Sequence, residues 1–449
     1  MENPRYAGRP TNGKLEMPDP LKRRGFCPGV WAPMPSGDGL LVRVRAPRGR
    51  LNAQQIRGLS GAARRFGNGI VELTRRANLQ LRGASEPTLP DLQAELLRLA
   101  LASPTAAAER RPALSVCPFD GLDRRCPPLE PLAEALEALL AEPELTRNLS
   151  DKFALLLNGG SPLFDDLQFD VRIDATRGGW ARLSVAGTAL GACRSEDVAA
   201  AVRALLVWLG ATVPAHARMS QLLDARGSTA LAGALQLEPA RAPLEAPWAA
   251  EHLGFHLVPD TGGGYFGFEL PFGSLEASDW DAIAELAERY GNGAVRLLPA
   301  RALLLLGVRE RSAAALAQHA RSRRFGVERS PLRLVACSGA PACGSARGET
   351  RRFALELAAL IPAAHLPHDE QLTLHVSGCE KGCAWSDRAA ITVLHGEGGV
   401  RLGFDTSVAE TARSAPLDPG AVRQRIAARF TRQRQQPLPA LQHTGGLPA

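Results

Sequence analysis

The chain has 449 residues, of which 45% are hydrophobic and 22% charged, and its formal net charge is +7 at pH 7. These values are typical of a globular protein with more than one domain. The mild positive charge, with no dense run of lysine or arginine and only 5% aromatic residues, argues against a nucleic-acid partner. No apolar run reaches transmembrane length and the N-terminus lacks a signal-peptide core, so we expect a cytoplasmic protein without a membrane partner.

The first folded unit predicted by the pattern begins after a polar, Pro- and Gly-rich arm at residues 1–28. It consists of a strand, a helix and two further strands, expected at residues 39–47, 51–67, 68–74 and 78–83. Asn52 is placed to cap the helix and Gly67 to end it. Asn68 and Gly69 form a dipeptide typical of a tight turn.

The same unit returns at residues 262–307, so the chain contains an internal repeat with an offset of 224 residues. The tripeptide Gly67-Asn68-Gly69 recurs as Gly291-Asn292-Gly293. The second copy carries apolar residues on its strands, at Phe266, Phe268 and Leu303–Leu305, where the first copy carries arginines. These arginines are Arg43, Arg45, Arg75, Arg76 and Arg82. Such a cluster favours anion binding, because guanidinium groups pair with carboxylates, although a solvated strand face is the alternative.

Each copy is followed by a similar strand that ends in cysteine, at Cys117 and at Cys337. After the first, helices are expected at residues 129–142 and 196–209, and strands at 151–160, 169–175 and 183–188. Residues 214–248 are rich in Pro, Ala and Arg, and we expect their later part to link the halves. From residue 431 the tail is predicted to be disordered.

Four cysteines in the second half form the clearest chemical motif, as Cys-x5-Cys followed after 35 residues by Cys-x3-Cys. They are Cys337, Cys343, Cys379 and Cys383. Four thiolates can ligate the four irons of a [4Fe-4S] cluster. Zinc is an alternative, although structural zinc sites usually use Cys-x2-4-Cys spacings. Four unrelated buried cysteines are the remaining alternative.

The cysteine pattern, placed in the second of two tandem copies, resembles that of the sulfite and nitrite reductase family. The opening segment GFCPGVWAPMPSGDGLLVRVRAP is similar to that of the precorrin-3B synthases within this family. The resemblance implies an α+β fold with pseudo-twofold symmetry, in which two ferredoxin-like half-units pair into one sheet and two α+β domains flank it. The expected units are an arm (1–28), half-unit 1 (29–100), a cluster-free, tetrapyrrole-binding α+β domain (101–235), half-unit 2 (236–330), a cluster-bearing α+β domain (331–430) and a tail (431–449).

The same resemblance implies a tetrapyrrole bound in a cleft by basic and polar residues of the first half. Carried over by motif, these are Arg43, Arg45, Thr74, Arg76, Asn78 and Lys152. The last cysteine, Cys383, is expected to lie nearest the ring. Two expected features of the siroheme motif are absent, because Ala154 replaces a second lysine and Pro112-Ala113 replace an arginine-asparagine pair. These departures favour a tetrapyrrole other than siroheme.

The reaction implied is oxygen-dependent monooxygenation of precorrin-3A at the C20 meso carbon, with γ-lactone formation, in aerobic cobalamin biosynthesis. Dioxygen is the co-substrate, and electrons from NADH are expected to arrive through a separate reductase or ferredoxin. A mononuclear non-haem iron is also implied, for which nearby candidates are His365, His368, Asp369 and His375; no catalytic residue is assigned. The alternatives are a siroheme-dependent sulfite or nitrite reductase and a non-catalytic iron–sulfur electron carrier.

Overall fold

The computed structural model describes residues 27–212, 219, 228–239, 251–366 and 371–432. Residues 1–26 of the predicted arm, much of the predicted linker, nearly all of the predicted disordered tail, and the candidates His368 and Asp369 lie outside these ranges. Within them, no helix has both the length and the apolar character that a membrane crossing requires.

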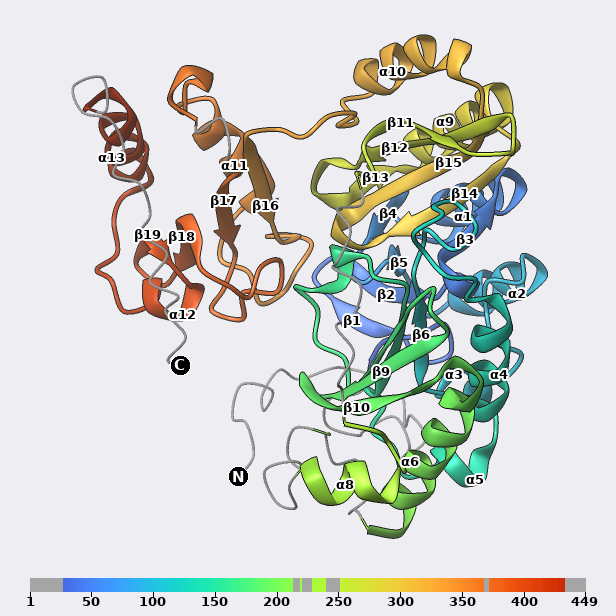
Figure 1. Ribbon diagram of the computed structural model, residues 1–449. Coiled ribbons are helices and arrows are strands. Elements are labelled where there is room, and N and C mark those ends of the chain that lie inside the picture. Colours follow the sequence, from blue (N-terminus) through green and yellow to red (C-terminus); the bar gives the residue numbers. More distant parts are fainter. Residues whose placement is uncertain (1–26, 213–218, 220–227, 240–250, 367–370, 433–449) are drawn as a thin grey trace.

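The two repeat copies form two five-stranded sheets that exchange one strand each (Figure 1). The first sheet contains, in spatial order, β1 (Met34–Ser36), β2 (Gly39–Val44), β5 (Leu79–Ala84), β4 (Ile70–Leu73) and β13 (Ser274–Glu276). The second contains β11 (Gly254–Val258), β12 (Gly263–Glu269), β15 (Ala302–Val308), β14 (Ala294–Leu298) and β3 (Arg50–Asn52). Thus β13 of the second copy completes the first sheet, and β3 of the first copy completes the second.

The expectation of one shared sheet was therefore wrong. The chain leaves each copy's own sheet through a short turn that contains a residue with a positive φ angle, Arg48 (52°) in the first copy and Phe272 (53°) in the second. The strand after each turn then pairs antiparallel with the other copy, so that Leu51 lies opposite Val295 and Leu275 lies opposite Val71. The two sheets are joined by this reciprocal pairing.

Two helices of equal length, α1 (Ala53–Phe66) and α9 (Ala277–Tyr290), contribute with both sheets to one common core. As predicted, Asn52 caps α1, and Gln55 completes a capping box with it. The helix ends at the predicted Gly67. The shorter helices α2 (Leu89–Arg98) and α10 (Ala313–Ser322) also contribute buried leucines to this core.

The two α+β domains share the topology of their first four strands, and the first domain has a fifth strand. The first contains β6 (Ala113–Val116), β7 (Ala154–Asn158), β8 (Val171–Ala175), β9 (Trp180–Val185) and β10 (Thr188–Arg194), with helices α3 (Ala106–Glu109), α4 (Glu130–Leu140), α5 (Pro143–Thr146), α6 (Val198–Thr212) and α8 (Ser228–Ala234). The second contains β16 (Leu332–Ala336), β17 (Leu372–Ser377), β18 (Ala389–Gly396) and β19 (Gly399–Thr406), with α11 (Thr350–Ala358), α12 (Val408–Thr411) and α13 (Pro419–Arg432).

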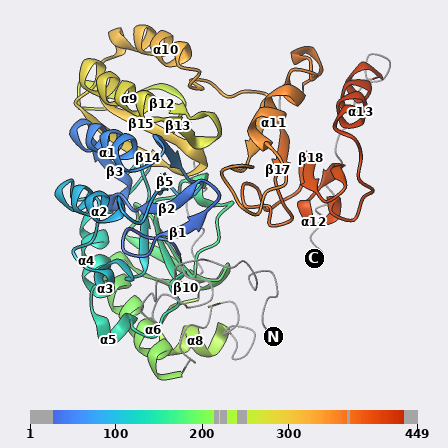
Figure 2. The ribbon, with the colours of Figure 1, turned by 180° about the vertical axis from the view of Figure 1, so that it is seen from behind.

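In each α+β domain the first three strands are parallel and the fourth is antiparallel. Cys117 therefore follows the first strand of its domain as Cys337 follows the first strand of the other, which agrees with the equivalence predicted from the sequence. Figures 1 and 2 show the second α+β domain standing to one side of the remaining units, reached by the segment after α10.

Each α+β domain docks on the sheet that belongs mainly to the other repeat copy. Arg296 of β14 donates hydrogen bonds of 2.6 Å to the carbonyl oxygens of Pro118 and Asp120, which fixes the first domain on the second sheet. At the offset of 224 residues, Arg296 corresponds to Glu72 of β4. Glu72 accepts a 3.2 Å hydrogen bond from Ser338, which fixes the second domain on the first sheet.

Glu72 is only 6% exposed, and its carboxylate also pairs with Arg82 and Arg351. Burial alone would raise the pKa of Glu72, but the two arginines outweigh it and hold that pKa below its usual value. The stabilisation from this pairing is therefore complete above the unfolded pKa of about 4.3 and is lost as the pH falls through the lower folded pKa.

We predict that Glu72→Gln lowers the free energy of unfolding by about 3 kcal/mol, because it leaves Arg351 without its carboxylate partner and leaves the buried Arg82 with Asp38 alone. The difference from wild type should be the same at pH 6 and pH 8, since Glu72 is ionised throughout that range in both the folded and the unfolded chain. Urea unfolding followed by tryptophan fluorescence measures it.

The matched control is Glu288→Gln, which removes an exposed carboxylate that pairs with Arg57 at 2.6 Å. An exposed pair of this kind contributes less than about 1 kcal/mol. If Glu72→Gln and Glu288→Gln lowered the free energy of unfolding equally, the buried Glu72 would have no special role in stability.

Candidate functional site

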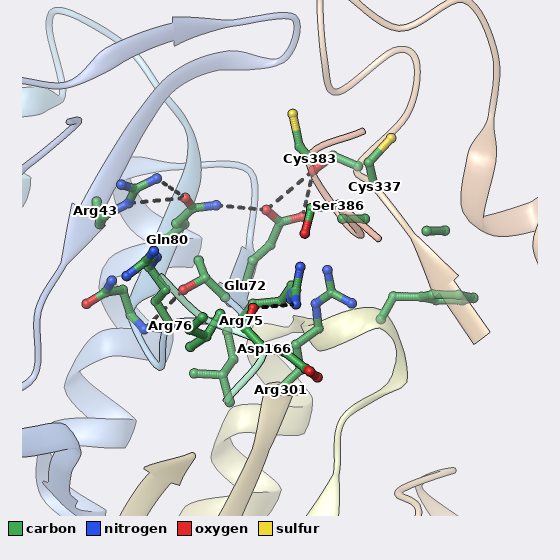
Figure 3. A pocket seen from close by; sticks show the side chains of 18 of the residues that line it. Arg43, Glu72, Arg75, Arg76, Gln80, Asp166, Arg301, Cys337, Cys383 and Ser386 are labelled. Atoms are coloured by element: carbon green, nitrogen blue, oxygen red, sulfur yellow. Dashed lines mark hydrogen bonds between the residues drawn. The ribbon is translucent and has the colours of Figure 1, made fainter. Parts of the chain in front are cut away.

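A cavity of about 750 Å³ lies between the first sheet, the first α+β domain and the cysteine loops of the second α+β domain (Figure 3). Its lining includes Arg43, Glu72, Thr74, Arg75, Arg76, Asn78, Gln80, Asp165, Asp166, Gln168, Arg301, Cys337, Ser338, Arg351, Cys383 and Ser386. Four of the six predicted substrate-binding residues are thus brought together with two of the four predicted cluster ligands.

The polar wall of the cavity follows from strand alternation in the first sheet. Val42 and Val44 of β2 lie in the core, so Arg43 between them points to the opposite face. Arg43 donates two hydrogen bonds of 2.9 and 3.3 Å to Gln80 of β5. Gln80 in turn donates a 3.2 Å hydrogen bond to Glu72. This chain of contacts fixes the direction of the Arg43 side chain.

Positive charge is concentrated along this wall. Burial, and then the neighbouring charges of Arg45 and Arg76, lower the pKa of Arg43. A guanidinium still remains protonated at neutral pH. Arginines that have lost water and lie beside other arginines gain more from an incoming carboxylate than fully solvated ones would.

The turn between β4 and β5 supplies the other predicted residues. The Asn78 N–H donates a 3.1 Å hydrogen bond to the Thr74 hydroxyl, which closes the turn. Arg76 donates a 2.6 Å hydrogen bond to the carbonyl oxygen of Gln168 and lies over the ring of Phe169. The turn of the first half-unit is thereby held against the first α+β domain.

Two predicted positions lie elsewhere. Arg45 lines a neighbouring cavity of about 470 Å³, which it shares with Arg76 and Asn78, and it donates to the carbonyl oxygen of Arg111. Lys152 is exposed in the turn before β7 and lines none of the described cavities, so the structure does not bring it to the candidate site.

Arg82, one of the arginines in the predicted anion-binding cluster, has a structural role instead. It is 3% exposed and pairs with Asp38 at 2.8 Å and with Glu72 at 3.2 Å. It also donates a 2.6 Å hydrogen bond to the carbonyl oxygen of Ala342, in the first cysteine loop. Its charge is already balanced within the protein.

The four predicted cluster ligands occupy two adjacent loops, after β16 and after β17. Burial raises the pKa of the Cys383 thiol, and the charges of Cys379, Cys337 and Cys343 raise it further. The backbone N–H of Gly378 donates a 3.2 Å hydrogen bond to Sγ of Cys337. A Cβ atom at Gly378 would meet the Ala346 side chain at 2.7 Å and this sulfur at 3.3 Å.

The four cysteines are free thiols and supply the donor set that a [4Fe-4S] cluster takes. Among the described residues, no three His, Cys, Asp or Glu side chains are grouped to hold a metal ion, so the comparison of cluster and zinc rests on the chemistry of the donor set. A cubane distributes its thiolates over four separate irons, whereas tetrahedral zinc draws four sulfurs to one point. The Gly378 N–H that donates to the sulfur of Cys337, and the close packing of Gly378 beside it, are compatible with thiolates that ligate a cubane.

The histidine candidates for a mononuclear iron do not form a ligand set in the part of the chain that the structure describes. His365 lies in the short turn Ala363–His365, and His375 lies on β17. Neither belongs to a group of three possible ligands. Trp385, two residues after Cys383, contacts the guanidinium groups of Arg75 and Arg333 through its ring.

Sequence reasoning missed two arginines of the site, Arg301 and Arg351. Arg301 is embedded in the apolar segment LLPARALLLL, which reads as a continuous strand region. The repeat offset offered a signal, because Arg301 corresponds to Ala77 in the turn that follows Arg76. Arg351 is the second residue of helix α11, and its role depends on a contact with Glu72 that no local pattern records.

Comparisons with known proteins agree with this architecture. The model of the "Nitrite/Sulfite reductase ferredoxin-like half domain" matches residues 32–99 and again residues 256–322, which are the two repeat copies. The solved structure of the Mycobacterium tuberculosis NirA protein superposes with a TM-score of 0.69 at 19% identity, over 89% of this chain and 82% of that one. This likeness shows a shared fold.

Two curated relatives identify the family. Precorrin-3B synthase from Sinorhizobium sp is 32% identical over 85% of this chain and 82% of its own length. Ferredoxin–nitrite reductase from Synechococcus elongatus is 26% identical over 90% of this chain and 88% of its own length. The chain therefore belongs to the sulfite and nitrite reductase family of oxidoreductases, in the group of the precorrin-3B synthases.

Proposed function

We propose that this protein is an oxygen-dependent monooxygenase of aerobic cobalamin biosynthesis, which converts precorrin-3A to precorrin-3B. The observation that carries the proposal is the single cavity in which Arg43 and Arg76 of the first half lie with Cys337 and Cys383 of the second. The precorrin-3B synthase from Sinorhizobium, at 32% identity, supports this substrate over others of the family.

The cavity is suited to a large anionic ring. A uroporphyrinogen-derived tetrapyrrole carries carboxylates around an apolar macrocycle, so its recognition needs several cations spread over a wide surface. The cavity volume of about 750 Å³ falls within the range of small-molecule sites. Arg43 and Arg76, on a strand and a tight turn, are held in place by Gln80 and by the carbonyl oxygen of Gln168, respectively. Rigid cations of this kind orient a ring as well as bind it.

The proposed reaction inserts one atom of dioxygen at the C20 meso carbon, and the ring-A acetate closes a γ-lactone. The other oxygen atom leaves as water, for which two electrons and two protons are needed. We propose NADH as the ultimate electron donor, acting through a separate reductase or ferredoxin. Residues of this chain would bind the ring, fix C20 relative to the cysteine loops and exclude bulk water.

We propose that Cys337, Cys343, Cys379 and Cys383 hold a [4Fe-4S] cluster. When bound, the cluster supplies single electrons at the cavity wall. The hydrogen bond from Gly378 to the sulfur of Cys337 would stabilise the thiolate form that ligation requires.

A siroheme-dependent reductase is the second candidate, because curated relatives of this chain include ferredoxin–nitrite reductases. The two functions differ in what the purified protein contains and consumes. We predict that the full chain, purified anaerobically, has iron, acid-labile sulfide and a broad cluster absorbance without the intense bands of siroheme. It should consume dioxygen only when precorrin-3A and an electron source are present.

Siroheme bands together with nitrite or sulfite reduction would overturn the proposal in favour of the reductase. Zinc without sulfide would contradict both functions. A non-catalytic electron carrier would have the cluster but would not consume dioxygen with precorrin-3A.

The cysteine assignment has its own test. We predict that Cys379→Ser loses most of the iron, sulfide and cluster absorbance, because one iron of the cluster loses its thiolate. Cys193→Ser is the matched control, since Cys193 is a half-buried free cysteine on β10, outside the four-cysteine set. Iron and sulfide analysis measures both variants, and an unchanged cluster in Cys379→Ser would refute the assignment.

The basic wall is tested by ring binding. We predict that Arg76→Ala weakens binding of an octacarboxylate porphyrin about tenfold or more, because a charged hydrogen bond is lost, while the cluster spectrum stays intact. Lys152→Ala should have a smaller effect, since Lys152 is exposed and lines none of the described cavities. Loss of the cluster in Arg76→Ala would contradict the proposed division of labour between the halves.

A further inference from the structure

Arg301 enters the cavity from the second half-unit. It ends the short turn Pro299–Arg301 between β14 and β15, with a φ angle of 67°. At the repeat offset its counterpart is Ala77, whose φ angle is 56° in the turn between β4 and β5. The two copies thus direct equivalent turns toward the cavity. Figure 3 shows Arg301 among the lining residues, well away from Arg43.

The guanidinium of Arg301 has no hydrogen-bond or ion-pair partner among the described residues, although the other arginines of this region do. Arg82 and Arg351 pair with Glu72, and Arg296 donates to two carbonyl oxygens. Burial, and then the charges of Arg351 and Arg75, lower the pKa of Arg301 to about 10. A desolvated cation beside other cations is unfavourable until an anion joins it.

A second unpartnered polar group lies on β17, in the α+β domain that carries the cysteine loops. His375 of β17 is fully buried, and neither of its ring nitrogens has a hydrogen-bond partner in the described part of the chain. Burial, and then the charges of Arg301 and Arg75, lower its pKa to about 4, so the imidazole is neutral at physiological pH. His375 lines none of the described cavities, so the preference of this wall for an anion comes from the unpaired guanidinium of Arg301.

We infer that Arg301 anchors a carboxylate subsite on the wall contributed by the second repeat copy, opposite the subsite formed by Arg43 and Arg76. This inference rests on the proposed function and adds to it that the ring is held from both halves. Arg301 lines both the main cavity and an adjoining cavity of about 340 Å³, which also contains Trp385 and Arg333. The carboxylate bound by Arg301 therefore lies at the boundary between these two cavities.

The test uses uroporphyrin I, an octacarboxylate porphyrin, titrated into the full-length cluster-containing protein and followed by quenching of its fluorescence. Arg301→Gln should raise the Kd about tenfold or more, and Arg301→Lys should raise it less, because lysine keeps the charge but loses the bidentate geometry. Arg311→Gln is the matched control, since Arg311 is an exposed arginine of the same half-unit outside the cavity lining, and its Kd should equal that of wild type.

A thermal melt of the free protein distinguishes binding from a structural role. Arg301→Gln should leave Tm unchanged or raise it, because the variant removes a half-buried unpaired charge, whereas loss of a structural contact would lower Tm. Equal porphyrin affinity in wild type and Arg301→Gln would overturn the inference while leaving the proposed function intact. Failure of the wild-type protein to bind uroporphyrin I at all would instead overturn the proposed function, and the inference with it.

Discussion

The arrangement of the candidate site depends on one buried carboxylate. Glu72 sits on a strand of the first sheet and accepts from Arg351 and Ser338 of the second α+β domain. Ser338 is the residue after Cys337, so the same contact that docks the domain also sets the position of the first cysteine loop relative to the arginine wall. A buried ion pair is costly to desolvate, and its main benefit is that only one relative placement satisfies all the partners.

The duplicated fold uses its two copies differently because different domains cover their outer faces. At the repeat offset, Gln80 of the first sheet corresponds to Leu304 of the second. Gln80 faces the cavity, whereas Leu304 is fully buried in the core of the first α+β domain. The apolar strands of the second copy are therefore explained by contact with a domain, and the arginine-bearing strands of the first copy border a ligand-sized space. Similar strand geometry serves packing in one copy and recognition in the other.

Features encoded locally could be predicted from the sequence. The repeat, the cap at Asn52, the end of α1 at Gly67 and the polar face that carries Arg43 all follow from spacing within one element. Features that depend on distant contacts could not be predicted from the sequence. The exchange of strands, the balanced charge of Arg82 and the exposure of Lys152 are set by residues far away in the chain. Arg82 was assigned to anion binding as a member of an arginine cluster, and Lys152 was assigned to ligand binding by motif comparison.

The strand exchange also constrains how the chain can be assembled. The first sheet is completed only when Ser274 pairs with Glu72, about 200 residues earlier in the chain. During synthesis from the N-terminus, the edge at β4 must therefore remain open while the whole first α+β domain is made. Contacts of such long sequence separation are slow to form, and an open strand edge is prone to pair with other chains. The two half-units are consequently a single folding unit, and we expect neither to form a complete sheet when expressed without the other.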